Sequence, residues 1–146
     1  MPSLRWGILG TARINRRLIP AIRLARRSEL VAVASRDRAR ADAYATEWAI
    51  PRGVEGYQTL LDDPDIDAVY IPLPNSEHVP WTLAALAAGK HVLCEKPIAL
   101  DAADVDRIAA AAAAAHRVVE EGFMFRHEPL TAKVMELVDA GALGTI

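Results

Sequence analysis

The sequence predicts an α/β fold, a doubly wound parallel sheet of about six strands flanked by helices. Strand-like apolar segments alternate with helix-like segments along the whole chain. The strand segments are continuously apolar, as in parallel sheets that are covered on both faces. This alternation implies right-handed crossovers, and ligands of such sheets bind beyond the carboxyl ends of the strands.

In the first half of the chain, strands and helices are expected to alternate from residue 4 onward. The expected elements are a strand at 4–9, a helix with apolar positions between 14 and 25, a strand at 29–34, a helix over 41–48, a short strand near Val54, a small helix at 59–61 and a strand at 67–71.

The second half continues the same order. The expected elements are a helix with Val79, Leu83 and Leu86 that ends near Gly89, a strand at 91–94, a helix capped by Asp101 whose tail is the alanine run 109–115, a strand at 117–120, and a last helix with Leu130, Val134, Leu137 and Val138 that stops at Gly141.

Composition excludes several classes of function. The 146 residues suffice for one domain with a core, and the net charge of −2, with both signs interspersed, gives no footprint for nucleic acid or an anionic membrane. No apolar run approaches the ~18 residues of a membrane span, and no secretory signal is expected. We therefore expect a soluble, cytoplasmic protein without a membrane or nucleic-acid partner. A single cysteine and four scattered histidines predict no disulfide and no metal site.

The turn after the first expected strand carries part of a dinucleotide fingerprint. The G-x-G-x-x-G register falls on Gly10, Ala12 and Asn15, so only the first glycine is kept. Ala12 is the smallest substitute, whereas Asn15 is bulkier and is expected to push the following helix outward. An ordinary glycine turn is the alternative. The context favours nucleotide binding, because the turn opens a helix and helix N-termini attract phosphate.

The second expected strand ends in Ser35-Arg36-Asp37, about 25 residues past Gly10, near where a ribose-binding acid is expected. A hydroxyl beside a guanidinium suits a 2′-phosphate, which favours NADP over NAD. Two alternatives remain open: Asp37 binds a ribose diol, or it only caps the next helix.

Further motifs follow the later strands: IPLPNSEH, then CEKP, then EEGFMFRHEP. Together with GILGTARI and SRD, in this order, they resemble the Gfo/Idh/MocA family of oxidoreductases (glucose-fructose oxidoreductase, inositol dehydrogenase) from Leu4 to Ile146. The resemblance implies an N-terminal Rossmann domain that binds NAD(P). It also implies hydride transfer between the nicotinamide and a sugar, polyol or diol.

Carried over position by position, the resemblance implies a set of cofactor-binding residues. They are Gly10, Thr11, Ala12, Arg13 and Ile14 at the pyrophosphate; Ser35, Arg36 and Arg40 at the adenosine ribose; Leu73, Pro74, Asn75 and His78 after the fourth strand; Glu95 and Lys96 at the nicotinamide ribose; and Arg126 near the nicotinamide and substrate.

Lys96 is the expected catalytic residue. Pro97 fixes φ and ends the strand, so the lysine is held at the carboxyl edge. A cation there stabilises the alkoxide that develops during hydride transfer. The alternative is a surface lysine paired with Glu95. A departure from the family's aromatic pattern around Arg126, with Glu128 in place of a histidine, leaves the substrate open.

The resemblance also implies a C-terminal substrate domain that these 146 residues lack. We therefore expect residues 1–146 to form one NAD(P)-binding domain that binds NADP(H) with little or no turnover unless a second domain or chain completes the site. The alternative is a non-catalytic, cofactor-sensing or partner-binding module. The apolar face of the last helix predicts a homo-oligomer through that region.

Overall fold

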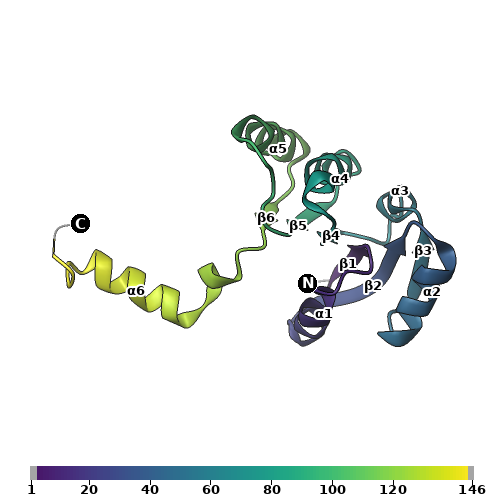
Figure 1. Cartoon of the computed structure of the whole chain (residues 1–146), viewed down its shortest axis with the longest axis horizontal. Helices are drawn as coiled ribbons and strands as arrows, with labels where there is room; N and C mark the ends of the chain where they lie inside the picture. Colours follow the sequence, from purple (N-terminus) through teal and green to yellow (C-terminus); the bar gives the residue numbers. More distant parts are fainter. Residues whose placement is uncertain (1–2, 145–146) are drawn as a thin grey trace.

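The computed structural model describes residues 3–144, which form one parallel six-stranded sheet with helices on both faces (Figure 1). The strands are β1 (Leu4–Leu9), β2 (Ser28–Ser35), β3 (Arg52–Glu55), β4 (Ala68–Ile71), β5 (His91–Cys94) and β6 (Val119–Glu121). Their spatial order is β3-β2-β1-β4-β5-β6. This is the Rossmann strand order, so the predicted fold class is confirmed.

The helices lie in the order that the sequence predicts. They are α1 (Asn15–Leu24), α2 (Arg38–Glu47), α3 (Tyr57–Leu61), α4 (Asn75–Ala87), α5 (Ala102–Ala115) and α6 (Pro129–Asp139). The 3-10 helix η1 (Met124–His127), between β6 and α6, was not predicted from the sequence. Asp101 caps α5 as expected, since its carboxylate accepts a hydrogen bond from the backbone N–H of Asp104 at 2.9 Å.

The core consists of two apolar layers, one on each side of the sheet. On one side, Ile19 of α1 and Ala45 of α2 pack against the strands. On the other side, α3, α4 and α5 contribute Leu60, Leu86 and Ile108. Successive strand residues serve opposite layers, which explains why the strands are continuously apolar.

The strand boundaries differ from the prediction by one residue at β2 and β4, and by two residues at the start of β6. The sixth strand was expected at 117–120 but runs over Val119–Glu121. The backbone N–H of Arg117 bonds to the carbonyl of Ala112, after His116 has adopted a left-handed conformation with φ of 53°. Arg117 therefore completes the end of α5 and does not pair in the sheet.

The segment after β6 leaves the body of the molecule. Helix α6 extends away from the sheet as an arm that is joined through η1 (Figure 1). Its apolar side chains at Leu130, Val134, Met135 and Leu137 are exposed, and Val138 is half-buried. The expected uncovered apolar face on the last helix is present.

Candidate functional site

The carboxyl ends of all six parallel strands meet at one edge, and the residues that the sequence singled out follow these ends. Residues 10–14 follow β1, Ser35 and Arg36 end β2, residues 73–75 follow β4, and residues 95–96 follow β5. A single sheet edge therefore gathers side chains from four distant parts of the sequence.

The turn after β1 requires a glycine. Gly10 has φ of +101°, and a Cβ at this position would lie 2.9 Å from Cδ2 of Leu73. Gly10 and Leu73, both expected at the cofactor, are thus in direct contact across the β1 and β4 ends. Helix α1 begins five residues later without a side-chain cap, so its first N–H groups have no side-chain acceptor.

Asn15 is accommodated inside this turn. Its side chain is fully buried, and Nδ2 donates to the carbonyl oxygen of Gly10 at 2.9 Å. The Asn15 side chain was expected to push α1 outward because it is larger than glycine. It instead forms a hydrogen bond that closes the loop of residues 10–15.

At the end of β2, Asp37 is the N-cap of α2, because its Oδ1 accepts from the backbone N–H of Arg40 at 2.8 Å. The capping alternative is therefore the one that the structure supports. Ser35 is buried at the strand end, while Arg36 and Arg40 are exposed. Within residues 3–144, neither guanidinium forms an ion pair.

Tyr57 belongs to this edge and was not singled out from the sequence. Its hydroxyl lies 3.6 Å from the position that a Cβ on Gly10 would take. Burial raises the pKa of this hydroxyl, the positive charges of Arg36 and Arg40 oppose that rise, and the negative charge of Glu77 adds to it. Its position directly after Gly56, at the end of β3, is the signal that could have found it.

The stretch Glu95-Lys96-Pro97 follows β5, and the Lys96–Pro97 peptide bond is cis. The side chain of Lys96 is exposed, and it makes no ion pair with Glu95 in the described part of the chain. Glu95 instead accepts a hydrogen bond at 2.7 Å from the hydroxyl of Tyr70, a residue of β4. The structure therefore does not support a lysine that merely pairs with its neighbour.

His78 is buried at the start of α4 and bridges two loops. Its ring nitrogens lie 2.7 Å from the carbonyl oxygen of Leu73 and 2.7 Å from that of Pro97. Both nitrogens thus face backbone carbonyls and are not available to a ligand. Pro74 and Asn75, at the N-terminus of the same helix, are exposed.

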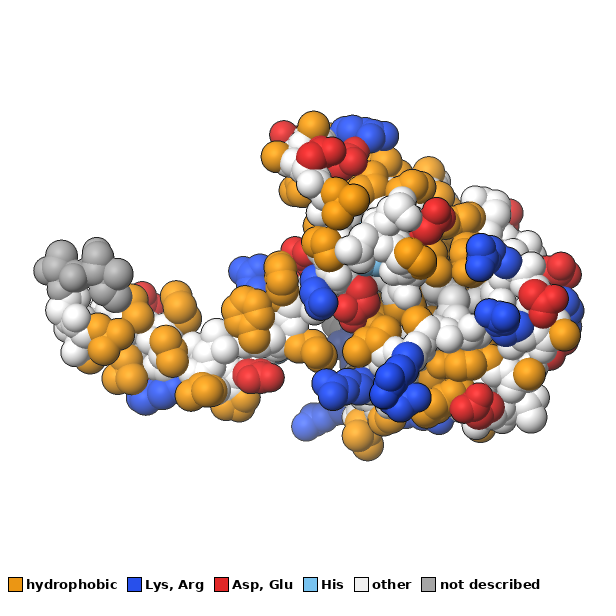
Figure 2. Space-filling view, viewed as in Figure 1, with side chains coloured by type: hydrophobic (Ala, Val, Ile, Leu, Met, Phe, Trp, Pro, Cys, Tyr) orange, Lys and Arg blue, Asp and Glu red, His pale blue; other side chains and the backbone are white. Residues whose placement is uncertain are grey.

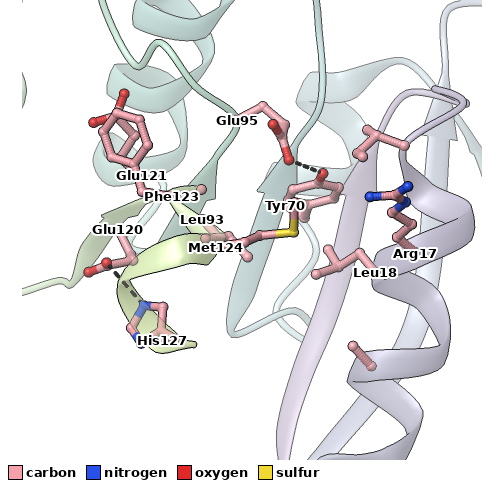
Figure 3. Close-up of a pocket in the computed structure, with 13 residues that line it drawn as sticks. Arg17, Leu18, Tyr70, Leu93, Glu95, Glu120, Glu121, Phe123, Met124 and His127 are labelled. Atoms are coloured by element: carbon pink, nitrogen blue, oxygen red, sulfur yellow. Dashed lines mark hydrogen bonds and ion pairs between the residues drawn. The ribbon is translucent and has the colours of Figure 1, made fainter. Parts of the chain in front are cut away.

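A cavity of about 340 Å³ lies beside Glu95, between α1 and η1 (Figure 3). Apolar side chains of Leu18, Leu93, Phe123 and Met124 form much of its wall. Burial and the hydrogen bond to Glu95 raise the pKa of the Tyr70 hydroxyl, so Tyr70 stays protonated and donates.

Arg126 lies on η1 and is exposed, and it does not line this cavity. Its expected place near the nicotinamide stays a prediction. Cys94 is fully buried, and burial raises the pKa of its thiol to about 12, so it is an unreactive strand residue.

Residues 3–144 offer neither a metal site nor a membrane span. No cluster of three or more His, Cys, Asp or Glu side chains is placed to hold a metal ion. No helix in this range has both the length and the apolar character that crossing a bilayer requires.

Comparison with known proteins identifies the family. The model of the Gfo/Idh/MocA family, described as "Oxidoreductase family, NAD-binding Rossmann fold", matches residues 4–123. The chain is 46% identical over 145 residues to dTDP-3,4-didehydro-2,6-dideoxy-alpha-D-glucose 3-reductase of Streptomyces violaceoruber, covering 99% of this chain and 42% of that protein. It is 45% identical over 144 residues to D-xylose 1-dehydrogenase (NADP(+)) 2 of Haloferax volcanii, covering 98% of this chain and 44% of that protein.

Solved structures agree. A 3-ketoreductase from Actinomadura kijaniata in complex with NADP superimposes with a TM-score of 0.89 at 40% identity, over 99% of this chain and 46% of that one. The chain therefore belongs to the Gfo/Idh/MocA oxidoreductase family and is similar to its NAD-binding Rossmann domain. It spans less than half the length of these relatives.

Proposed function

We propose, from its membership of this family, that the chain is the NADP(H)-binding domain of an oxidoreductase that transfers hydride between the nicotinamide and a sugar, polyol or diol. One observation carries the proposal. The carboxyl edge of the sheet combines a turn that needs glycine for its positive φ with three cations, Arg36, Arg40 and Lys96, that form no ion pair within residues 3–144. Such an edge fits an anionic dinucleotide.

The residues present fit the parts of NADP. The turn of Gly10, Thr11, Ala12, Arg13 and Ile14 presents backbone to a pyrophosphate at the start of α1. Ser35 and Arg36 present a hydroxyl and a guanidinium to the adenosine ribose, with Arg40 one turn further on. Asp37, the residue that would favour a 2′-hydroxyl, already caps α2.

The comparison supports the same cofactor. The 3-ketoreductase was solved with NADP, and the Haloferax dehydrogenase is named for NADP(+). Both, like the Streptomyces reductase, are named for reactions at a ketone, a sugar or a sugar nucleotide. We therefore place this chain's substrate among sugars and related carbonyl or carbinol compounds.

Lys96 is the residue to which we assign the chemistry. NADP(H), when bound, supplies or accepts the hydride. The ammonium of Lys96, which is exposed at the same edge, donates hydrogen bonds to the nicotinamide ribose and to the reacting oxygen, and it stabilises the negative charge of that oxygen. Glu95, whose carboxylate is held by Tyr70, accepts from the nicotinamide ribose.

Residues 1–146 form, in this proposal, one cofactor-binding unit that supplies half of a substrate site. Orientation of both reactants accounts for much of an enzyme's rate, so a unit that holds only the cofactor turns over little or not at all. A second domain or chain would contribute the rest of the substrate pocket.

A second candidate function has its own observation. The exposed apolar side chains of the α6 arm, Leu130, Val134, Met135 and Leu137, favour association (Figure 2). The chain would then be a homo-oligomer through that region, or a non-catalytic module that senses the cofactor or binds a partner. Light scattering over a concentration series tests the homo-oligomer, and a monomer throughout would contradict it.

The experiment that tests the main proposal is calorimetric titration with NADPH and, separately, with NADH. We expect tighter binding of NADPH, and we expect Arg36→Ala to weaken NADPH binding by about tenfold or more while leaving NADH unchanged.

Arg38→Ala is the matched control, since Arg38 is a neighbouring exposed arginine that is already paired with Asp42 at 2.8 Å. It should leave both affinities unchanged. If the wild-type chain binds neither nucleotide, the cofactor proposal fails and the partner-binding candidate takes its place.

A further inference from the structure

The short loop that carries Lys96 is tied to the body of the protein by side chains from three other elements. The Tyr70 hydroxyl of β4 donates to Oε1 of Glu95 at 2.7 Å. The ring of His78 in α4 contacts the Pro97 carbonyl at 2.7 Å. The carboxylate of Glu121 in β6 accepts from the backbone N–H of Ile98 at 2.9 Å.

Lys96 itself lies between these attachments and is exposed. A lysine side chain is a point charge on a flexible four-carbon stem, so its direction depends on how firmly its backbone is held. Both the residue before it and the two residues after it are held by side chains that come from outside the loop.

Glu121 is brought to this loop by close packing at the end of β6. The next residue, Gly122, donates its N–H to the Cys94 carbonyl at 2.7 Å. A Cβ on Gly122 would lie 3.3 Å from that carbonyl oxygen and 3.4 Å from Oε1 of Glu95. This tight contact holds the β6 end against the Glu95 side of the loop, so the carboxylate of Glu121 reaches Ile98.

We propose that Glu121 is a positioning residue for hydride transfer, because its hydrogen bond to the Ile98 N–H fixes the backbone that directs the Lys96 ammonium toward the cofactor. This inference rests on the proposed function. Glu121 lies in the EEGFMFRHEP motif but has no role assigned there, and its bond to a backbone N–H across 23 residues appears only in the tertiary structure.

The adjacent residue provides a matched control. Glu120 lies on the same strand, and its carboxylate is 3.7 Å from the His127 ring on the other side of the strand (Figure 3). It makes no hydrogen bond to residues 95–98 in the described part of the chain.

The first experiment measures NADPH affinity by calorimetry for Glu121→Ala, Glu121→Asp, Glu121→Gln and Glu120→Ala. We expect the Ala and Asp variants to bind about tenfold more weakly, since one lacks the acceptor and the other lacks the reach. Glu121→Gln should return to within about twofold of wild type, because its amide oxygen still accepts from Ile98. Glu120→Ala should bind like wild type.

The same substitutions in a Lys96→Met background separate positioning from general damage. If Glu121 acts through Lys96, Glu121→Ala has little further effect there. An undiminished effect in that background, or a Gln variant as weak as the Ala variant, would overturn the proposal.

A second readout does not need the cofactor. The chain has three lysines, so ¹³C reductive methylation gives few signals, and Lys96→Arg assigns the one from Lys96. We expect this signal to shift in Glu121→Ala and Glu121→Asp but not in Glu121→Gln or Glu120→Ala. A wild-type chain that does not bind NADPH contradicts the proposed function, and the methyl signal then decides alone whether Glu121 holds Lys96.

Discussion

The two lysines that flank β5 have opposite surroundings. Lys90, at the amino end of the strand, is 7% exposed, and its Nζ donates to the carbonyl oxygens of Asp63 at 2.7 Å and Ile66 at 2.8 Å. Lys96, at the carboxyl end, is exposed and has no hydrogen-bond or ion-pair partner within residues 3–144. The same side chain serves the fold at one end of the strand and is available to a ligand at the other.

The contrast extends along both edges of the sheet. At the amino edge, Arg5 bonds to Asp67 and Asp65. At the carboxyl edge, Arg36 and Arg40 form no ion pair among the described residues. Cations without an ion-pair partner beside the carboxyl ends of the strands, where ligands of such sheets bind, are typical of a site for an anion.

The largest effect is expected from removing Lys90, which tests the amino edge of the sheet. Lys90→Met removes the donor that reaches the buried Ile66 carbonyl and one of the two donors to the partly buried Asp63 carbonyl, and it should lower the free energy of unfolding by about 2–3 kcal/mol. Urea denaturation measures this. Lys133→Met, which removes an exposed lysine on α6, is the control and should stay within about 0.5 kcal/mol of wild type. Equal effects of the two variants would contradict the structural role of Lys90.

Lys96→Met tests the carboxyl edge of the sheet. It should weaken NADPH binding by about tenfold, because one charge-assisted hydrogen bond to the cofactor is lost. The free energy of unfolding should change by less than about 0.5 kcal/mol, since no protein partner is lost. Calorimetry and urea denaturation of the same sample give both values. A strongly destabilised variant with unchanged affinity would reverse the assignment of the two lysines.

Asp67→Asn tests the Arg5–Asp67 pair of the amino edge through the pH dependence of stability. The hydrogen bonds from Arg5 lower the pKa of Asp67 to about 2, below its ordinary value of 3.8. A lowered folded-state pKa contributes stability that is present above about pH 4 and lost as the pH falls toward 2.

The variant should therefore lose about 1 kcal/mol at neutral pH, a value reduced because the pair is partly exposed, and its stability should fall less steeply between pH 4 and 2. Asp65→Asn, in which the carboxylate removed is mostly exposed, should have a smaller effect. Thermal melts across this pH range measure the difference in stability. Parallel curves of stability against pH for wild type and Asp67→Asn would contradict the prediction.

The smallest effect is expected at an arginine beside the site that is already paired. Arg38→Ala removes an exposed i,i+4 pair with Asp42 and should lower stability only slightly, by less than any change above, because solvent screens the pair. Careful urea titrations resolve such a change. A loss as large as that of Asp67→Asn would mean that the paired and unpaired arginines of this region differ less than the structure indicates.

Sequence reasoning found most of the fold because its signals are local. Continuous apolar strands, helical spacing and the Asp101 cap each depend on residues within a few positions of one another. Sequence reasoning did not find the start of β6, because Arg117 could equally join the strand or complete α5. The hydrogen bond from the Arg117 N–H to the Ala112 carbonyl assigns this residue to the end of α5.

The sequence by itself determined the α/β class and which residues follow the strand ends, since periodicity and motif order encode both. Only the tertiary structure decided which side chains form hydrogen bonds to which loops at that edge. Tyr70 holds Glu95, His78 joins two loops, and Glu121 reaches Ile98. These contacts cross between elements that are 19 to 25 residues apart in the chain. They depend on strand register and side-chain reach, which no local pattern specifies.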